Sequence, residues 1–157
     1  MDAVERCEHC HCGHSNAALM VAEFHRTFRC PVRDAPTIDV PEVEMRVRLI
    51  REEFQELCDA LSQPFLYASK EDQIADVADA LGDLLYVVHG AALTFGIPLD
   101  KCVEKIHEAN MRKLWPDGQP RWRLDGKIIK PDDWCAPNLA AVLFPEGDDY
   151  GAPEQMP

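Results

Sequence analysis

Three aspartates recur along one apolar stretch, and this stretch constrains the fold more than any other part of the sequence. Asp76, Asp79 and Asp83 are spaced three and four residues apart, so on a helix they share one face. The apolar residues around them recur at the same helical steps: Ile74, Val77, Ala78, Leu81, Leu84, Leu85, Val88 and Ala92. The pattern predicts a long helix buried in the core, with its end at Gly96 and a close approach of another helix at Gly90.

The charge on this stripe of aspartates needs a partner. Three like charges on one face repel each other, and Asp83 lies in a run that is apolar on both sides. A carboxylate buried without a partner is costly and tends to take up a proton. A divalent cation such as Mg²⁺, which prefers oxygen ligands, would keep the stripe ionised. A solvated helix face accounts equally well for Asp76 and Asp79, whereas we expect Asp83 to be buried.

A second acidic stretch precedes the first. Glu52, Glu53 and Glu56 lie within a stretch, from about residue 42 to residue 61, whose apolar residues also follow the helical period. If this helix packs antiparallel against the aspartate helix, several carboxylates converge. Such a cluster suits two or more Mg²⁺ ions bound to a polyphosphate. Taken alone, a run of glutamates is more often a solvated acidic face.

The two acidic stretches together resemble the MazG-like all-α NTP pyrophosphohydrolase superfamily, whose pattern is E-E-x-x-E followed by E-x-x-D on the next helix. The matching residues are Glu52, Glu53, Glu56 and Asp83. Ala80 stands where the glutamate of the second motif, E-x-x-D, is expected. Asp79 is the nearest acid that could substitute for it. The resemblance covers most of residues 20–143 and is closest to the compact phage and bacterial branch, through Glu23-Phe24-His25 and the segment 110–113.

The resemblance implies an all-α fold: a four-helix bundle completed by oligomerisation, with a short C-terminal hairpin or loop within 121–130. We expect a homodimer or homotetramer, because two long helices cannot by themselves cover an apolar third helix. The expected organisation is a Cys/His-rich tail over residues 1–14, the pyrophosphohydrolase domain over 15–143, and a second tail over 144–157.

The resemblance also implies an activity, whereas the residues alone predict only a polycarboxylate metal site. That activity is hydrolysis of a (deoxy)nucleoside triphosphate to the monophosphate and pyrophosphate, in nucleotide-pool control. The base is left open between a purine such as dGTP and a pyrimidine such as dUTP or dCTP. The expected Mg²⁺ or Mn²⁺ ligands are Glu53, Glu56, Asp79 and Asp83, the catalytic pair is Glu52 and Glu53, and the nucleotide contacts are His25, Asn110, Lys113 and Lys127. Within the catalytic pair, Glu52 is expected to orient or deprotonate the attacking water.

Two other classes of protein remain open at this point. A catalytically silent interaction bundle with a metal-stabilised core is compatible with Ala80 in the motif. A di-iron carboxylate oxidase would need Glu-x-x-His pairs on two helices, and neither acidic stretch has a histidine at that step.

The composition limits which binding partners and which cellular compartment we expect for the protein. The formal net charge of -12 disfavours a nucleic acid polymer or an anionic membrane as partner. An odd number of cysteines, seven, and no visible secretory signal predict a reduced, cytoplasmic protein. Six cysteine and histidine residues lie within residues 7–14. Four of them, Cys7, Cys10, Cys12 and His14, predict either a structural Zn²⁺ site or simply a Cys/His-rich tail.

Overall fold

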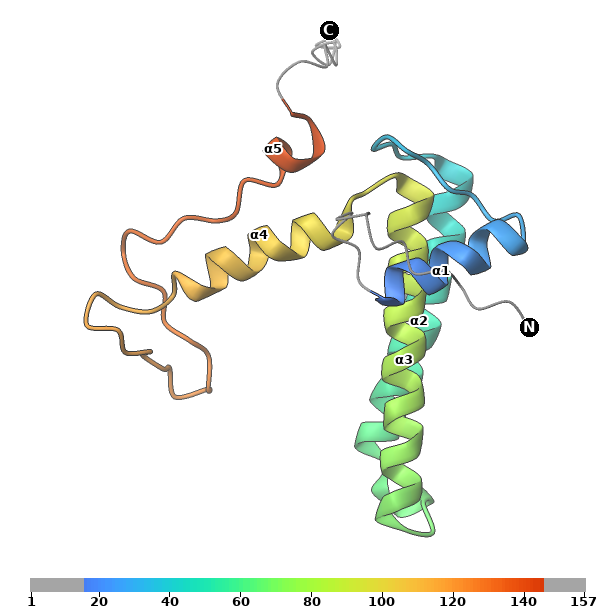
Figure 1. The fold of residues 1–157 in the computed structure, drawn as a ribbon. Coiled ribbons are helices and arrows are strands. Elements are labelled where there is room, and N and C mark those ends of the chain that lie inside the picture. The colour runs from blue at the N-terminus through green and yellow to red at the C-terminus, as the bar shows by residue number, and fades with distance from the viewer. Residues whose placement is uncertain (1–15, 146–157) are drawn as a thin grey trace, which may run out of the picture.

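The computed structural model describes residues 16–145, and this part of the chain is helical, with no named strand (Figure 1). Its elements, in order, are α1 (Asn16–Thr27), α2 (Val40–Ser62), the 3-10 helix η1 (Pro64–Leu66), α3 (Lys70–Phe95), α4 (Leu99–Met111) and α5 (Ala140–Leu143). An antiparallel bridge between Trp122 and Ile128 is isolated and forms no strand. The all-α class is therefore confirmed, while the C-terminal hairpin stays a prediction.

The two long helices α2 and α3 form an antiparallel hairpin, which is the spine of the molecule (Figure 1). The hydroxyl of Ser69 caps α3 by accepting a 3.1 Å hydrogen bond from the Asp72 backbone N–H. The side-chain amide of Gln73 donates a 2.8 Å hydrogen bond to the carbonyl of Ala60 on α2. The hairpin is thus fixed at its turn by backbone and side-chain bonds as well as by packing.

The other end of α3 is built into a small core. Gly96 ends the helix in the left-handed region at φ 65°, a conformation that favours glycine. The backbone N–H groups of Arg33 and Thr37 donate hydrogen bonds to the carbonyls of Leu93 and Phe95, at 2.9 and 3.0 Å. Helix α1 also packs against this end, where the buried side chains include Val21, Ala22, His25, Arg46, His89, Ala91, Ala92 and Thr94.

In the single chain, α3 is buried only toward its C-terminal end, so the burial predicted for the rest of the helix stays a prediction that depends on a second copy. Asp83 is exposed, and its neighbours Leu81 and Leu85 are 52% and 50% exposed. The reason is that α1 covers only the C-terminal part of α3, so the part that carries the aspartates packs mainly against α2. By length and composition alone α3 could cross a bilayer; the core helix of a soluble protein meets the same criterion.

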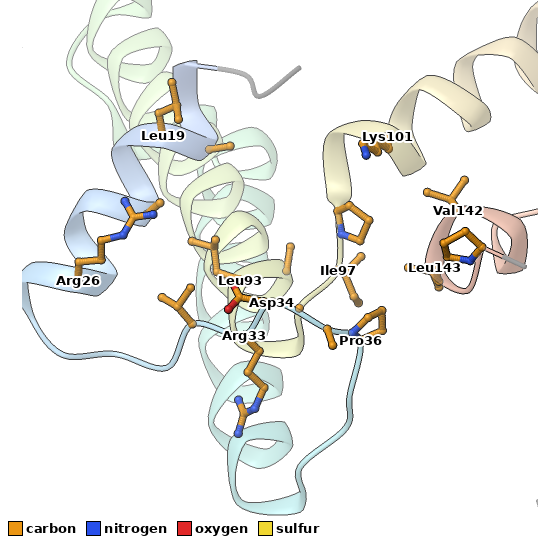
Figure 2. Close-up of a pocket in the computed structure, with 18 residues that line it drawn as sticks. Leu19, Arg26, Arg33, Asp34, Pro36, Leu93, Ile97, Lys101, Val142 and Leu143 are labelled. Carbon is orange, nitrogen blue, oxygen red and sulfur yellow. The ribbon is translucent and has the colours of Figure 1, made fainter. Parts of the chain in front are cut away.

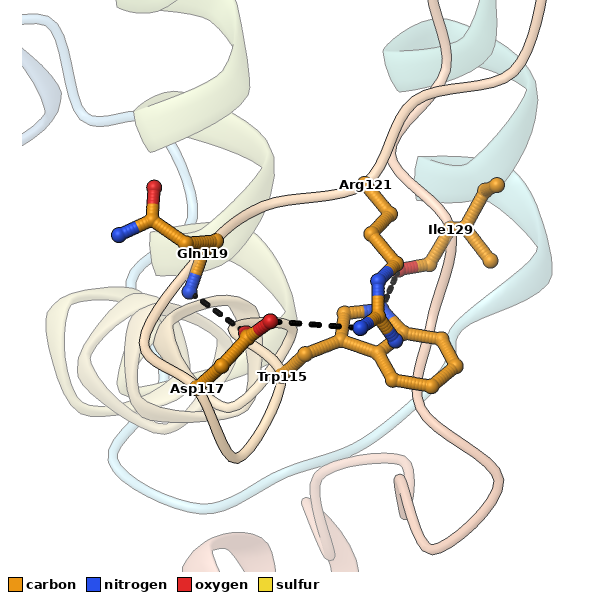
Figure 3. A network of polar contacts seen from close by, with 5 residues as sticks. All are labelled: Trp115, Asp117, Gln119, Arg121 and Ile129. Carbon is orange, nitrogen blue, oxygen red and sulfur yellow. Dashed lines mark hydrogen bonds and ion pairs between the residues drawn. The ribbon is translucent and has the colours of Figure 1, made fainter.

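Helix α4 and the segment after it form an arm that leaves the body formed by α1, α2 and α3 (Figure 1). Within the arm, the indole N–H of Trp134 donates a 2.7 Å hydrogen bond to the carbonyl of Ala109 on α4. Figure 3 shows a second cluster, in which the guanidinium of Arg121 lies 3.7 Å from the ring centroid of Trp115 and pairs with Asp117 at 3.3 Å. Both sets of contacts join residues within the arm, and neither joins the arm to the body.

Candidate carboxylate site

The predicted acidic residues of α2 and α3 lie near one another, on the part of the hairpin that α1 does not cover. Glu53 is the half-buried member, whereas Glu52, Glu56, Asp79 and Asp83 are exposed. Burial raises the pKa of Glu53, and the carboxylates of Glu56, Asp83, Glu52 and Asp79 raise it further, in that order. The structure therefore brings together the acids predicted as metal ligands and catalytic residues.

A cavity of about 320 Å³ opens beside this cluster, between α2, α3 and their connection. Its lining residues are Glu56, Asp59, Ala60, Tyr67, Asp76, Asp79 and Ala80. Neither Asp59 nor Tyr67 is among the site residues predicted from the sequence. Asp59 is one helical step after Glu56, so helical spacing could have revealed it. Tyr67 lies in the connection after η1, where no periodicity marks a residue as part of a site.

The donors at this site fit a hard divalent cation in their chemistry. Carboxylate oxygens are the preferred ligands of Mg²⁺ and Mn²⁺, and a cation would relieve the repulsion that raises the pKa of Glu53. Within residues 16–145, however, no group of three or more His, Cys, Asp or Glu side chains is arranged closely enough to hold an ion. Ion binding would therefore require these exposed side chains to draw together.

Three predicted nucleotide contacts lie on the arm. The ammonium of Lys113 donates a 2.7 Å hydrogen bond to the side-chain carbonyl of Asn110 and lies 6.0 Å from the ring centroid of Trp134. Lys127 is exposed further along the same segment. Because α4 diverges from the α2–α3 hairpin (Figure 1), a single chain does not bring these residues to the carboxylates.

His25, the fourth predicted nucleotide contact, lies in the core instead. It is only 2% exposed, and its Nδ1 forms a 2.9 Å hydrogen bond with the carbonyl of Pro31. Burial lowers the pKa of His25, the bond to Pro31 partly offsets this, and the nearby charge of Arg46 lowers the pKa further. These surroundings indicate a neutral imidazole that packs α1 against the hairpin.

A larger cavity, of about 530 Å³, lies at the opposite end of α3 (Figure 2). It is bounded by α1, the loop 32–36, the end of α3, the start of α4, and α5. Arg26 and Lys101 line it, whereas Arg33 is held by the carbonyl of Thr94 and by Asp39. Its lining includes one carboxylate, Asp34, so it lacks the cluster of acids found beside Glu53.

The predicted Zn²⁺ site at Cys7, Cys10, Cys12 and His14 lies outside the described residues and stays a prediction. The cysteines that the structure does describe are free thiols: Cys30, Cys58, Cys102 and Cys135. None of them lines either cavity.

A long helical hairpin with acidic residues of both helices facing one another is the arrangement expected of an all-α nucleotide pyrophosphohydrolase. The chain belongs to the phosphoribosyl-ATP pyrophosphohydrolase family, whose sequence model matches residues 21–110. The match includes α2, α3 and most of α4. It confirms the predicted superfamily, while the assignment to a phage or bacterial branch stays a prediction.

One similar protein comes from a virus of amoebae. The uncharacterized protein L479 of Acanthamoeba polyphaga mimivirus is 34% identical over 115 residues, which is 70% of this chain and 40% of that protein. The chain therefore spans less than half the length of this relative. The similarity supports the family assignment, and the name of this relative gives no substrate.

Proposed function

We propose that the protein hydrolyses a nucleoside triphosphate between its α- and β-phosphates, releasing the monophosphate and pyrophosphate, with Mg²⁺ or Mn²⁺ as cofactor. One observation carries the proposal. Glu53 is half-buried among the carboxylates of Glu56, Asp79 and Asp83, in a chain that belongs to a pyrophosphohydrolase family. A concentration of negative charge of this kind is unfavourable without cations. The divalent metal ions that bind a triphosphate would supply that positive charge.

The proposed roles follow from the positions of the side chains. Glu53, Glu56, Asp79 and Asp83 would hold two or more ions. When bound, such ions neutralise phosphate charge and lower the pKa of a coordinated water. Glu52 and Glu53 are adjacent on α2 and point in different directions, so Glu52 is free to orient the attacking water or to accept its proton.

A second copy of the chain completes the proposed enzyme, as a homodimer or homotetramer. On the α2–α3 hairpin, Phe54 is 55% exposed and Ile74 is 68% exposed. On α4, Val103 is 52% exposed. Burying such apolar surface against a second copy is favourable by about 25 cal/mol per Å². Association also offers a way for Asn110, Lys113 and Lys127 to reach triphosphate bound at the carboxylates of another chain.

The substrate is proposed at the level of a class. A (deoxy)nucleoside triphosphate, either a purine such as dGTP or a pyrimidine such as dUTP or dCTP, fits a role in control of the nucleotide pool. Phosphoribosyl-ATP is the second candidate, because the family carries its name. The acidic charge and the described free thiols fit a cytoplasmic enzyme that binds neither nucleic acid polymers nor membranes.

A substrate screen tests this function. The full-length protein is incubated with Mg²⁺ or Mn²⁺ and a panel of standard and modified nucleoside triphosphates plus phosphoribosyl-ATP, and the products are separated by chromatography. We expect release of pyrophosphate from at least one compound, and none with Asp83→Asn. Metal-dependent stabilisation with no turnover of any compound would instead establish the silent helical interaction module.

A further inference from the structure

The segment that follows α4 is the basic part of an acidic chain. Residues 112–134 contain six lysine and arginine residues and four aspartates, in a chain whose net charge is -12. Arg121 and Arg123 each pair with an aspartate of this segment, at 3.3 and 2.9 Å. Lys113 and Lys130 pair with no carboxylate of the part of the chain that the structure describes. Their two ammonium groups can therefore accept an anion from outside the chain.

One indole ring brings these two lysines together. The ammonium of Lys130 lies 3.9 Å from the ring centroid of Trp134, and that of Lys113 lies 6.0 Å from it. The ring is itself fixed, because its N–H donates a 2.7 Å hydrogen bond to the carbonyl of Ala109, which is 1% exposed. Lys113 is also oriented by its 2.7 Å hydrogen bond to Asn110. Two lysines that are distant in sequence thus meet at one anchored side chain.

The chemistry of this cluster favours a phosphate chain as ligand. The face of an indole attracts a cation, whereas two ammonium groups beside the same ring repel each other. An anion bound to both would remove that repulsion. Each ammonium offers three donors and a compact charge, so the two together suit a ligand with several charged oxygens along its length. Pyrophosphate and the β- and γ-phosphates of a nucleoside triphosphate are such ligands.

We propose that Lys113 and Lys130, called the lysine pair below, bind the β- and γ-phosphates of the substrate, and that Trp134 is their positioning residue. This inference rests on the proposed function and deepens it, because it adds Lys130 and Trp134 to the site. Since α4 diverges from the α2–α3 hairpin (Figure 1), the lysine pair of one copy serves the carboxylates of a second copy. The arm thereby supplies positive charge to phosphates that the acidic hairpin alone would repel.

Binding of inorganic pyrophosphate in the presence of Mg²⁺ tests the lysine pair, by calorimetry on the full-length protein. Lys113→Met and Lys130→Met keep an apolar stem against the indole and remove the charge. Each should weaken the affinity about tenfold, as expected for a lost hydrogen bond to a charged group. Lys105→Met is the matched control, because it removes the same charge from an ammonium of α4 that already pairs with Glu108 at 2.9 Å. Wild-type affinity in both lysine-pair variants, or an equal loss in the control, would overturn the assignment.

Two substitutions of Trp134 test its positioning role. Trp134→Leu removes the ring and should weaken pyrophosphate binding at least as much as either lysine variant, because both ammonium groups lose their common support. Trp134→Phe keeps an aromatic face for the cations and should retain most of the affinity. Trp134→Leu should have no further effect once both lysines are methionine. A further loss in that background, or wild-type affinity in Trp134→Leu alone, would overturn the positioning role.

Mixed oligomers test whether the lysine pair acts on a second copy. Asp83→Asn and the double variant Lys113→Met/Lys130→Met are co-expressed with different affinity tags, and the species that carries both tags is purified. One site of that species combines the intact carboxylates of one chain with the lysine pair of the other, so its turnover should be well above that of either variant alone. Turnover no higher than that of the separate variants, or the absence of a species with both tags, would overturn the action on a second copy.

The outcomes also separate this inference from the proposed function. If the wild-type protein releases pyrophosphate from a nucleotide but binds inorganic pyrophosphate no better than the lysine-pair variants, the inference alone is wrong. If the pyrophosphate measurements follow the expectation while no nucleotide is hydrolysed, the function alone is wrong. A wild-type protein that neither binds pyrophosphate nor hydrolyses a nucleotide would contradict both.

Discussion

The two halves of α3 differ in what surrounds them. The C-terminal half contacts α1, α2 and the loop before α2, and Gly90, Ala91, Ala92 and Thr94 are buried there. The N-terminal half lies against α2 and the α2–α3 connection, and it presents its aspartates beside the glutamates of α2. Small residues allow close packing in the C-terminal half. Along one helix, the packed core thus lies apart from the carboxylate cluster.

The charges of the two halves differ in sign as well. The core beside the C-terminal half holds Arg46, which is 6% exposed and whose Nε has no hydrogen-bond partner among the described residues. Burial lowers the pKa of Arg46, while Cys30 and Glu42 oppose that shift. The N-terminal half gathers carboxylates that raise the pKa of Glu53. Changes in the acidic half should therefore affect turnover, and changes in the packed half should affect folding.

The largest expected effect is that of Asp83→Asn, which removes charge from the acidic half without removing volume. We expect turnover to fall at least about 100-fold, because metal-held charge stabilisation is worth several kcal/mol. The free energy of unfolding should change by less than about 0.5 kcal/mol, because the residue is exposed. Steady-state kinetics and urea denaturation measure the two quantities. Near-wild-type turnover would remove Asp83 from the site.

The next effect separates the three glutamates of α2. Glu53→Gln and Glu56→Gln should weaken Mg²⁺ affinity about 10- to 100-fold, whereas Glu52→Gln should mainly lower kcat, because Glu52 points away from its neighbour Glu53. Mg²⁺ titration combined with kinetics distinguishes the two patterns. An equal loss of affinity in all three variants would contradict the separate role of Glu52.

Gly90→Val tests the packed half. A Cβ at this position would lie 3.0 Å from the Nε2 of His25 and 3.1 Å from a terminal nitrogen of Arg46, so overpacking should lower the free energy of unfolding by about 1–3 kcal/mol. Turnover per folded molecule should stay close to that of the wild type. Gly82→Ala is the matched control for stability, because an added Cβ there meets no atom within 4 Å. If Gly90→Val lost turnover with unchanged stability, the packed half would serve turnover rather than folding.

The smallest expected effect is a dependence of stability on pH through His25. Because its pKa is lowered in the folded state, the unfolded chain binds the proton more readily once the pH falls below about 6.5. Stability should therefore be complete above that pH and decline as the pH falls toward the folded-state pKa. Thermal unfolding of His25→Gln should show a weaker decline, while the exposed control His107→Gln should follow the wild type. An unchanged decline in His25→Gln would assign it to other groups.

The sequence predicted the helices well, since apolar periodicity and Gly96 mark α3 locally. The sequence did not predict which side chains are buried or line the cavity, because that depends on what packs against each helix. Asp83 lies in an apolar run but is exposed, because α1 covers the other half of α3. His25 is buried through contacts with residues distant in sequence, and Tyr67 joins the cavity from an irregular connection. Spacing along one helix contains no information about such contacts.

The proposed role of the acidic half of α3 is to cleave a triphosphate between its α- and β-phosphates. The most direct measurement is the product stoichiometry from the best substrate of the panel, with Mg²⁺ and then with excess chelator. We expect equal amounts of nucleoside monophosphate and pyrophosphate, and no reaction when the metal is removed. Formation of nucleoside diphosphate and phosphate, or turnover that persists in the chelator, would contradict it.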